Sequence, residues 1–136
     1  MPNKKGGSGG CLCGGVRYRV TGSLSDIVAC HCSQCRRTTG HYFASTSCKR
    51  SALHLDREET LAWYESSPGI RRGFCSRCGS SLFWSDERRD GIDILAGTLD
   101  SPTGLKLTGH IFVQDKGDYY EIGDGLPQYA QRPPKT

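Results

Sequence analysis

Seven of the eight cysteines in this 136-residue chain fall into three tight clusters. Two clusters are pairs and one is a trio: Cys11-x-Cys13, Cys75-x-x-Cys78 and Cys30-His31-Cys32-x-x-Cys35. Cysteines two or three residues apart suit a shared metal ion better than distant disulfide partners. Four thiolates complete a structural zinc site, whereas a catalytic zinc keeps three protein ligands and one open position. Seven clustered cysteines therefore predict one zinc site of each kind.

Length and composition favour one small domain that metal ions help to hold together. A chain of 136 residues corresponds to a single domain. Only 35% of the residues are hydrophobic and 18 are glycine, so the core is thin and bound metal would add stability. We assign residues 11–129 to a zinc-binding domain, residues 1–10 to a flexible leader and residues 130–136 to a tail.

The first ten residues, MPNKKGGSGG, are polar and have no apolar stretch of the kind that a signal peptide needs. Nowhere does the chain approach the roughly 20 apolar residues that span a bilayer. Reduced, metal-binding thiols are typical of a reducing compartment. We therefore expect a cytoplasmic protein without a membrane partner.

The formal net charge of +4 invites a nucleic-acid interpretation. That charge leaves out the predicted metal sites. Seven thiolates would subtract seven charges and two zinc ions would return four, which leaves about +1. A charge this small gives little attraction to a phosphate backbone, so we expect no nucleic-acid partner.

Short apolar runs separated by turn signals predict a mainly β fold. Val16, Tyr18 and Val20 alternate with polar residues, which is typical of a half-buried strand. Residues 33–39 are polar and predict a single helical turn that Gly40 ends. Residues 123–136 are rich in glycine and proline and predict little regular structure. Further strands are expected at residues 27–29, 42–47, 61–64, 70–74, 81–84, 92–96 and 105–113.

The cysteines can be divided between two metal ions in more than one way. The economical grouping joins the two pairs in a closed structural site and leaves the trio as an open site. The closed site then holds Cys11, Cys13, Cys75 and Cys78, and the open site holds Cys30, Cys32 and Cys35. Two alternatives stay open: both sites are structural, with Cys48 or a histidine closing the second, or the pair at 75 and 78 joins the trio.

The remaining cysteine and the histidines have weaker patterns. Cys48 stands alone among polar residues and is interpreted as a bystander. His31 alternates with its two cysteine neighbours along an extended segment, so it faces away from them and favours a hydrogen bond over metal ligation. His41 and His110 can approach the open site, but the pattern favours an ordinary surface or core position for each. His54 has no distinctive neighbourhood.

The order of the motifs resembles that of the glutathione-dependent formaldehyde-activating enzyme family, which also includes centromere protein V. The resemblance covers residues 10–129. Its main motifs are Cys-x-Cys-Gly-Gly-Val-Arg-Tyr from residue 11, Cys-His-Cys-x-x-Cys-Arg-Arg from residue 30 and Phe-Cys-x-x-Cys-Gly-Ser-x-Leu from residue 74. Shorter matches are Ser66-Ser67-Pro68-Gly69, Gly97-Thr98-Leu99-Asp100, His110-Ile111-Phe112-Val113 and Asp124-Gly125-Leu126-Pro127.

The resemblance implies a β-tent, a fold of several small coiled antiparallel sheets around two zinc ions. It assigns structural zinc to the four paired cysteines and catalytic zinc to the trio, the same grouping as above. The implied reaction adds glutathione to formaldehyde and gives S-hydroxymethylglutathione, which makes the protein a carbon–sulfur lyase. Tyr119 stands where the family commonly has tryptophan, which bears on the substrate site if that segment lines it.

Zinc on three thiolates carries a net negative charge and binds a soft sulfur ligand well. It can activate a substrate thiol or polarise an aldehyde oxygen, and the sequence favours neither. Arg36 and Arg37 follow the trio and can offset its charge, bind a substrate carboxylate or simply lie in solvent. Four aromatic residues can shape the pocket or belong to the core: Tyr42, Phe43, Phe83 and Trp84.

Two functions of other classes remain as alternatives. One is a zinc-stabilised binding module for protein or nucleic acid, without catalysis. The other is a redox or metal sensor that releases zinc when the exposed trio is oxidised. The small-molecule partners expected for the enzyme are a thiol such as glutathione and an aldehyde.

Overall fold

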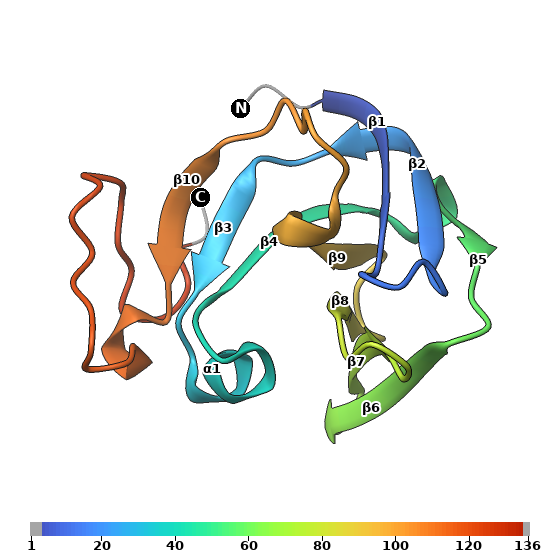
Figure 1. The fold of residues 1–136 in the computed structure, drawn as a ribbon. Helices are drawn as coiled ribbons and strands as arrows, with labels where there is room; N and C mark the ends of the chain where they lie inside the picture. Colours follow the sequence, from blue (N-terminus) through green and yellow to red (C-terminus); the bar gives the residue numbers. More distant parts are fainter. Residues whose placement is uncertain (1–3, 135–136) are drawn as a thin grey trace.

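The structure, a computed structural model, describes residues 4–134, and these form two β-sheets (Figure 1). A three-stranded sheet has the order β1-β2-β5, and a seven-stranded sheet has the order β10-β3-β4-β9-β8-β7-β6. The first sheet is built from β1 (Lys4–Gly10), β2 (Arg17–Leu24) and β5 (Leu53–Arg57). The second contains β3 (Ile27–Cys30), β4 (Phe43–Lys49), β6 (Leu61–Ser67), β7 (Ile70–Cys75), β8 (Ser81–Asp86), β9 (Gly91–Leu95) and β10 (Leu107–Ile111).

This architecture confirms the predicted mainly β class with antiparallel sheets. Within the described residues, every strand pair is antiparallel except β10 with β3. The chain passes from one sheet to the other between β2 and β3, where the Ser25 amide donates to the Ser47 carbonyl at 3.1 Å. Strands β2 and β4 lie side by side at this end. The seven-stranded sheet continues through β9, β8 and β7 to β6, whose Leu61 and Trp63 pack against the same core (Figure 1).

The hydrophobic core lies between the two sheets. The inward side chains of β2, among them Tyr18 and Val20, face Phe83 of β8 and Ile94 of β9. The rings of Tyr18 and Phe83 meet edge to face at 5.4 Å, a favoured aromatic arrangement. Cys11 and Cys75 belong to the same cluster of buried residues, so the first metal-binding motif is continuous with the core.

The predicted flexible leader is wrong for residues 4–10, which form β1 and pair with β2. A glycine-rich segment carries no apolar alternation that would announce a strand. Glycine is nevertheless required there, because a Cβ on Gly9 would lie 2.3 Å from the Thr98 carbonyl oxygen and 2.4 Å from the Tyr18 hydroxyl. Residues 1–3 of the leader and 135–136 of the tail lie outside the described residues.

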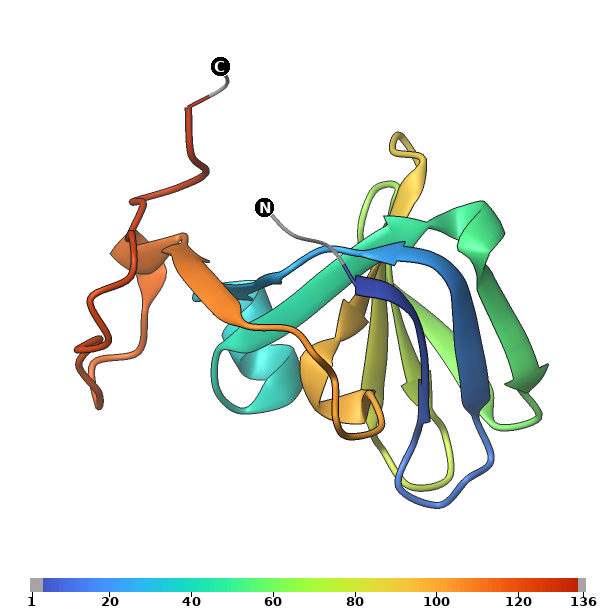
Figure 2. The same cartoon turned by 90° about the horizontal axis from the view of Figure 1, so that it is seen from above.

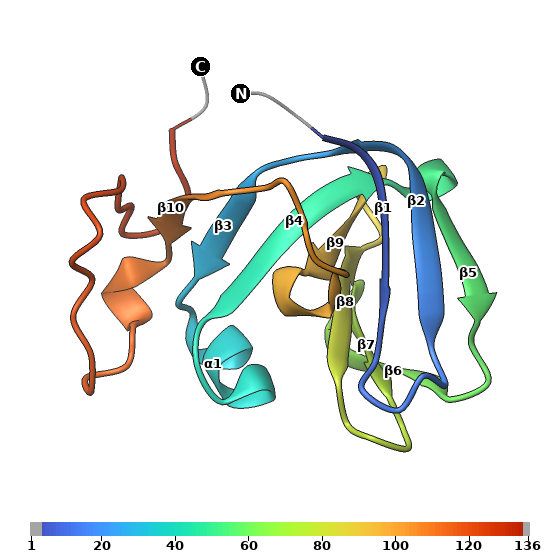
Figure 3. The same ribbon diagram turned by 45° about the horizontal axis from the view of Figure 1, so that its top comes forward.

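The one α-helix of the described chain, α1 (Ser33–Thr39), lies where a single helical turn was predicted and is seven residues long. Cys32 caps its start, and Gly40 ends it with a φ of 86°. Figure 3 shows α1 between the end of β3 and the start of β4, at one margin of the seven-stranded sheet. Strand β5 was not predicted. All the strands that were predicted are present, with shifted ends.

The segment after β10 has little regular structure, as predicted, yet backbone hydrogen bonds fix it to the sheet. The His110 amide donates to the Pro127 carbonyl at 2.9 Å, and the Tyr129 amide donates back to the His110 carbonyl at 2.9 Å. Figure 2 shows this segment on the outer side of β10, away from the three-stranded sheet. No helix among residues 4–134 is long and apolar enough to cross a membrane.

Candidate functional site

The first metal-binding candidate joins the loop after β1 to the loop after β7. Its thiols come from two segments far apart in the chain, Cys13 and Cys75 being 62 residues apart. Four sulfur atoms lie within 4.8 Å of one another, those of Cys11, Cys13, Cys75 and Cys78. This is the four-cysteine cluster, and its membership is the economical grouping expected from the sequence.

The sulfur spacing in the four-cysteine cluster fits a tetrahedral metal ion. Sulfur atoms about 2.3 Å from a tetrahedral zinc lie about 3.8 Å from each other. The Cys11 and Cys13 sulfurs are 3.6 Å apart, and those of Cys13 and Cys75 are 3.7 Å apart. A disulfide needs about 2.0 Å, and all eight cysteines, which lie within residues 4–134, are free. The donor set therefore fits a closed zinc site.

Hydrogen bonds to sulfur prepare the four-cysteine cluster for thiolate charge. The Val16 amide donates to the Cys11 sulfur at 3.2 Å, and the Cys78 amide donates to the Cys75 sulfur at 3.3 Å. The Arg77 guanidinium donates to the Cys13 sulfur at 3.3 Å. Ser80 and nearby hydrogen bonds lower the pKa of Cys78 to about 5. These donors orient and stabilise metal-binding thiolates.

The second candidate lies where β3 passes into α1. The sulfurs of Cys30, Cys32 and Cys35 lie within 4.8 Å of one another and form the three-cysteine cluster. Cys32 caps the helix, and its sulfur accepts from the Cys35 amide at 3.3 Å. The short helix thus places Cys35 beside Cys30 and Cys32 at the end of β3. Three thiolates without a fourth protein ligand in the cluster match the donor set of an open zinc site.

The three-cysteine cluster favours a thiolate at Cys32. Hydrogen bonds from the Cys30 and Cys35 thiols are the main reason that the pKa of Cys32 is lowered. The amides of Cys35 and Gln34 lower it further, whereas burial opposes them. Hydrogen bonding to Cys32 in turn raises the pKa of Cys30. A metal ion that displaced the protons shared among these three sulfurs would therefore bind a Cys32 sulfur that is already a thiolate.

Arg72 of β7 is the cation beside the three-cysteine cluster, a role that the sequence suggested for Arg36 and Arg37. Its two terminal nitrogens lie 3.7 and 3.6 Å from the Cys35 sulfur. It also donates to the Gln34 side-chain oxygen at 3.0 Å and to the Thr38 hydroxyl at 3.2 Å. Arg72 is only 7% exposed, so this charge is fixed against the thiolates.

His31 is fully buried and takes part in a chain of hydrogen bonds that leads away from the sulfurs. Its Nε2 lies 2.9 Å from His110 Nδ1, and His110 Nε2 lies 2.8 Å from the Asp124 carboxylate. His31 Nδ1 contacts the Tyr120 hydroxyl at 2.5 Å. Since the Asp124 carboxylate accepts, each imidazole donates through Nε2 and Tyr120 donates to His31. Burial lowers the pKa of His31 to about 4, so this ring is a neutral link in the chain of hydrogen bonds that fixes the β3 end.

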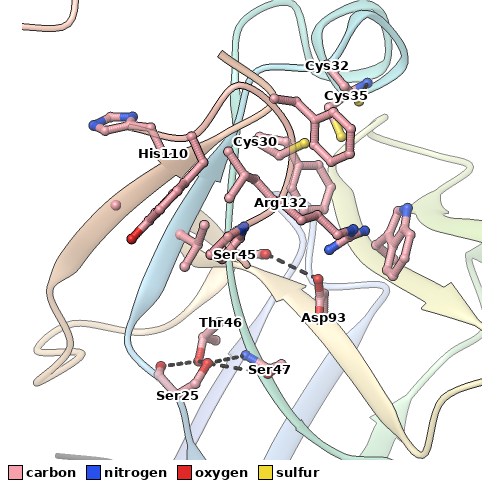
Figure 4. A pocket seen from close by; sticks show the side chains of 18 of the residues that line it. Ser25, Cys30, Cys32, Cys35, Ser45, Thr46, Ser47, Asp93, His110 and Arg132 are labelled. Atoms are coloured by element: carbon pink, nitrogen blue, oxygen red, sulfur yellow. Dashed lines mark hydrogen bonds between the residues drawn. The ribbon is translucent and has the colours of Figure 1, made fainter. Parts of the chain in front are cut away.

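A cavity of about 630 Å³ lies beside the three-cysteine cluster, within the size range of small-molecule sites. Figure 4 shows Cys30, Cys32 and Cys35 at one end and Ser25, Thr46 and Ser47 at the other, with Ser45, Asp93 and Arg132 between them. His110 lines the cavity as well. Among the four aromatic residues considered above, Phe43 and Trp84 line it, Phe83 belongs to the core and Tyr42 packs on His31.

Cys48 lies apart from both clusters. Strand pairing sets Phe43 opposite Cys30, and Cys48 is five residues further along β4, about 17 Å at the rise of a strand. Cys48 packs in the core, and burial raises its pKa to about 11. It therefore does not close the second cluster. Tyr119 is 60% exposed, its ring lies tilted against that of His41 with 5.5 Å between the ring centroids, and it does not line the cavity.

Sequence reasoning missed Arg72, Asp93 and Arg132 as parts of the site. Arg72 had a readable signal, because it shares one strand face with Ile70 and Phe74 and is thus an inward-facing charge. Asp93 alternates with buried Ile92 and Ile94, so its pattern is that of a solvent-facing residue. Arg132 belongs to the irregular segment after β10, where only the tertiary structure places it.

Comparison with known proteins gives consistent matches. Residues 7–115 match the family described as glutathione-dependent formaldehyde-activating enzyme. A Halomonas elongata protein, provisionally named as a glutathione-dependent formaldehyde-activating enzyme, is 33% identical over 126 residues, covering 84% of this chain and 79% of the relative. An uncharacterised lyase of Schizosaccharomyces pombe is 24% identical over 123 residues, covering 90% and 89% of the two chains. The crystal structure of a Rhodobacter sphaeroides protein has a TM-score of 0.61 at 23% identity over 89% of this chain and 98% of that one, which shows a shared fold.

The match to the family spans most of the chain and contains all seven clustered cysteines. The names of the relatives support a formaldehyde-activating or lyase function at this level of detail. The cavity beside the three-cysteine cluster is consistent with such chemistry. The chain belongs to the glutathione-dependent formaldehyde-activating enzyme family.

Proposed function

We propose that this protein is a zinc-dependent carbon–sulfur lyase that forms or breaks the adduct of a thiol with an aldehyde. The substrates we propose are glutathione and formaldehyde, with S-hydroxymethylglutathione as the adduct. One observation carries this proposal: three thiols, joined by no fourth ligand from residues 4–134, lie in the wall of a cavity large enough for a small molecule. The family and the relatives' names support the same reaction class.

We assign Cys30, Cys32 and Cys35 to a catalytic zinc and the four-cysteine cluster to a structural zinc, two ions for each chain. When bound by three thiolates, zinc supplies a soft Lewis acid that accepts a sulfur ligand and lowers the pKa of a thiol. The reaction is balanced without an oxidant. A carbon–sulfur bond forms, the carbonyl double bond becomes a carbon–oxygen single bond, and the thiol proton moves to that oxygen.

The protein's own residues position and charge-balance this site. Arg72 offsets the negative charge that three thiolates concentrate, because its guanidinium is held against Cys35. Gln34 fixes that guanidinium from the other side at 3.0 Å. Phe43 and Trp84 give the cavity apolar walls, which exclude water from the reacting thiol and strengthen its electrostatic contacts.

Metal-bound thiolates need a reducing environment, so we propose that the protein works in the cytoplasm. The eight free cysteines are consistent with this location. Two zinc sites also reduce the net charge to about +1, which disfavours a phosphate-driven nucleic-acid partner.

Replacement of Cys32 by alanine tests the function directly. We expect thiol–formaldehyde turnover, followed by NMR exchange between free and hydroxymethylated glutathione, to fall at least 100-fold, because the lowest-pKa ligand of the open site is lost. Cys48→Ala is the matched control, since this cysteine lies in the core, and it should keep turnover. Unchanged turnover in Cys32→Ala would mean that the trio is not catalytic and would favour a non-catalytic binding module.

A further inference from the structure

Four charged side chains line the cavity away from the three-cysteine cluster: Asp93, Arg89 and Arg132, and also Asp26, which follows Ser25 in the chain. Figure 4 shows Asp93 and Arg132 between the cysteine end and the hydroxyl groups at the opposite end. Asp93 extends from β9, whereas Arg132 comes from the segment that passes over the cavity after β10. One carboxylate and two guanidinium groups therefore share one wall region.

Among the described residues Asp93 forms no ion pair within 4.0 Å, although Arg89 and Arg132 lie near enough to act on its charge. Its closest polar contact is the Ser45 hydroxyl, which donates at 3.4 Å. Arg89 is paired with Asp86 at 3.8 Å, and the Arg132 guanidinium stacks over Phe112 at 5.5 Å. Burial raises the pKa of Asp93 to about 6. A cationic group of a ligand would complete the hydrogen bonding of this carboxylate.

We propose that Asp93, together with Arg89 and Arg132, forms a subsite that binds the zwitterionic amino-acid headgroup of a peptide thiol. Asp93 accepts from the ammonium group, and the two arginines bind the carboxylate of the same headgroup. The inference rests on the proposed function, because the thiol end of the ligand is placed at the three-cysteine cluster. The subsite selects thiols that carry this headgroup, a selectivity that the clustered cysteines do not provide.

Strand pairing sets the length of the ligand. Cys30 pairs with Phe43 on one side of β4, and the Asp93 carboxylate reaches Ser45 from the other side. Asp93 itself pairs with Ser47, but its carboxylate lies 3.4 Å from the Ser45 hydroxyl. One strand spacing, two residues along β4 and this contact therefore separate Cys30 from the carboxylate by roughly 8–11 Å. In an extended γ-glutamyl thiol peptide the free amine is eight bonds from sulfur, about 10 Å. In cysteine it is three bonds away, so cysteine is too short to reach both ends.

The test compares glutathione with N-acetylglutathione, which lacks the ammonium group, by calorimetric titration of the zinc-loaded protein at pH 7.5. We expect the wild type to bind glutathione about 10- to 100-fold more tightly, the contribution of a charge-assisted hydrogen bond. Asp93→Asn keeps the side-chain shape and should lose this preference. Asp118→Asn, an exposed carboxylate outside the cavity lining, should retain it.

Each result decides the proposal. Equal affinity of the wild type for the two thiols, or an unchanged preference in Asp93→Asn, overturns the subsite. Turnover without an ammonium preference leaves the lyase function standing and rejects the subsite. A preference for the ammonium group without turnover supports the subsite and rejects the lyase function. If neither thiol binds the zinc-loaded protein, both proposals are wrong.

Discussion

Asp93 shows how one side chain can relate ligand binding to stability. Its surroundings raise its pKa to about 6, mainly because burial disfavours the charged carboxylate, although Arg89 and Arg132 act in the opposite direction. The native state therefore binds a proton more readily than the unfolded state does. The contribution of Asp93 to the stability of the wild type therefore falls as pH rises from about 4 to about 6. A carboxylate retained at such a cost is consistent with a binding role.

Asp93→Asn should stabilise the zinc-loaded protein by about 2–3 kcal/mol at pH 7.5, because the variant buries no charge there. The gain should shrink to about half at pH 5, where most of Asp93 is protonated in the native wild type. Urea unfolding at the two pH values measures it. The groups that face Asp93 are Ser45, Arg89 and Arg132. A gain independent of pH would contradict the explanation.

Arg72 is the second residue whose role, in metal binding at the three-cysteine cluster, can be measured with a single substitution. Arg72→Met should weaken metal binding at the three-cysteine cluster about 10- to 100-fold, because it removes the charge and hydrogen bonds beside Cys35. Chelator competition should then show one zinc ion released early and one retained. Arg71→Met is the matched control, since Arg71 is exposed and lies over Trp63 at 4.7 Å. Identical release curves for Arg72→Met and wild type would be evidence against the assignment.

At the scale of elements, β1 shows that a strand can form without a hydrophobic pattern. Its backbone pairs with β2, and its glycines allow the close approach of Thr98 and Tyr18. The sequence predicted most other strands, because alternating residues such as Tyr18 and Val20 report one buried face. It predicted neither β1, in which no apolar residue alternates, nor β5, whose alternation is confined to Leu53 and Leu55.

Gly9→Ala should destabilise the protein by about 1–3 kcal/mol, because the added methyl overlaps the Thr98 carbonyl and the Tyr18 ring. Gly97→Ala is the control, since a Cβ there meets no atom within 4 Å. Thermal or urea unfolding of both variants gives the comparison. If the two substitutions cost the same, β1 is not packed against the core as described.

At the scale of the whole molecule, the four-cysteine cluster joins the loop after β1 to the loop after β7. It therefore ties the three-stranded sheet to the seven-stranded sheet, beside the core. The three-cysteine cluster instead lies at the margin, between β3 and a short helix. The two clusters should contribute differently to folding for this reason.

We expect two zinc ions in the wild type, one in Cys32→Ala and a largely unfolded protein in Cys11→Ala. Loss of a structural ligand removes metal-binding energy that the fold depends on. Mass spectrometry under native conditions counts the ions, and circular dichroism reports the β structure. A well-folded Cys11→Ala variant would contradict the structural role of the four-cysteine cluster.

The sequence by itself determined the mainly β class and the division of seven cysteines into four and three. Both depend on short-range spacing: alternation reports a buried strand face, and neighbouring cysteines report a shared ion. Tertiary structure alone decided that the positive charge of Arg72 lies beside the three-cysteine cluster, that Cys48 belongs to the core and that Asp93 faces a cavity. Those facts depend on which strands pair and what covers each face. Spacing along the chain does not encode contacts between β4, β7, β9 and the segment after β10.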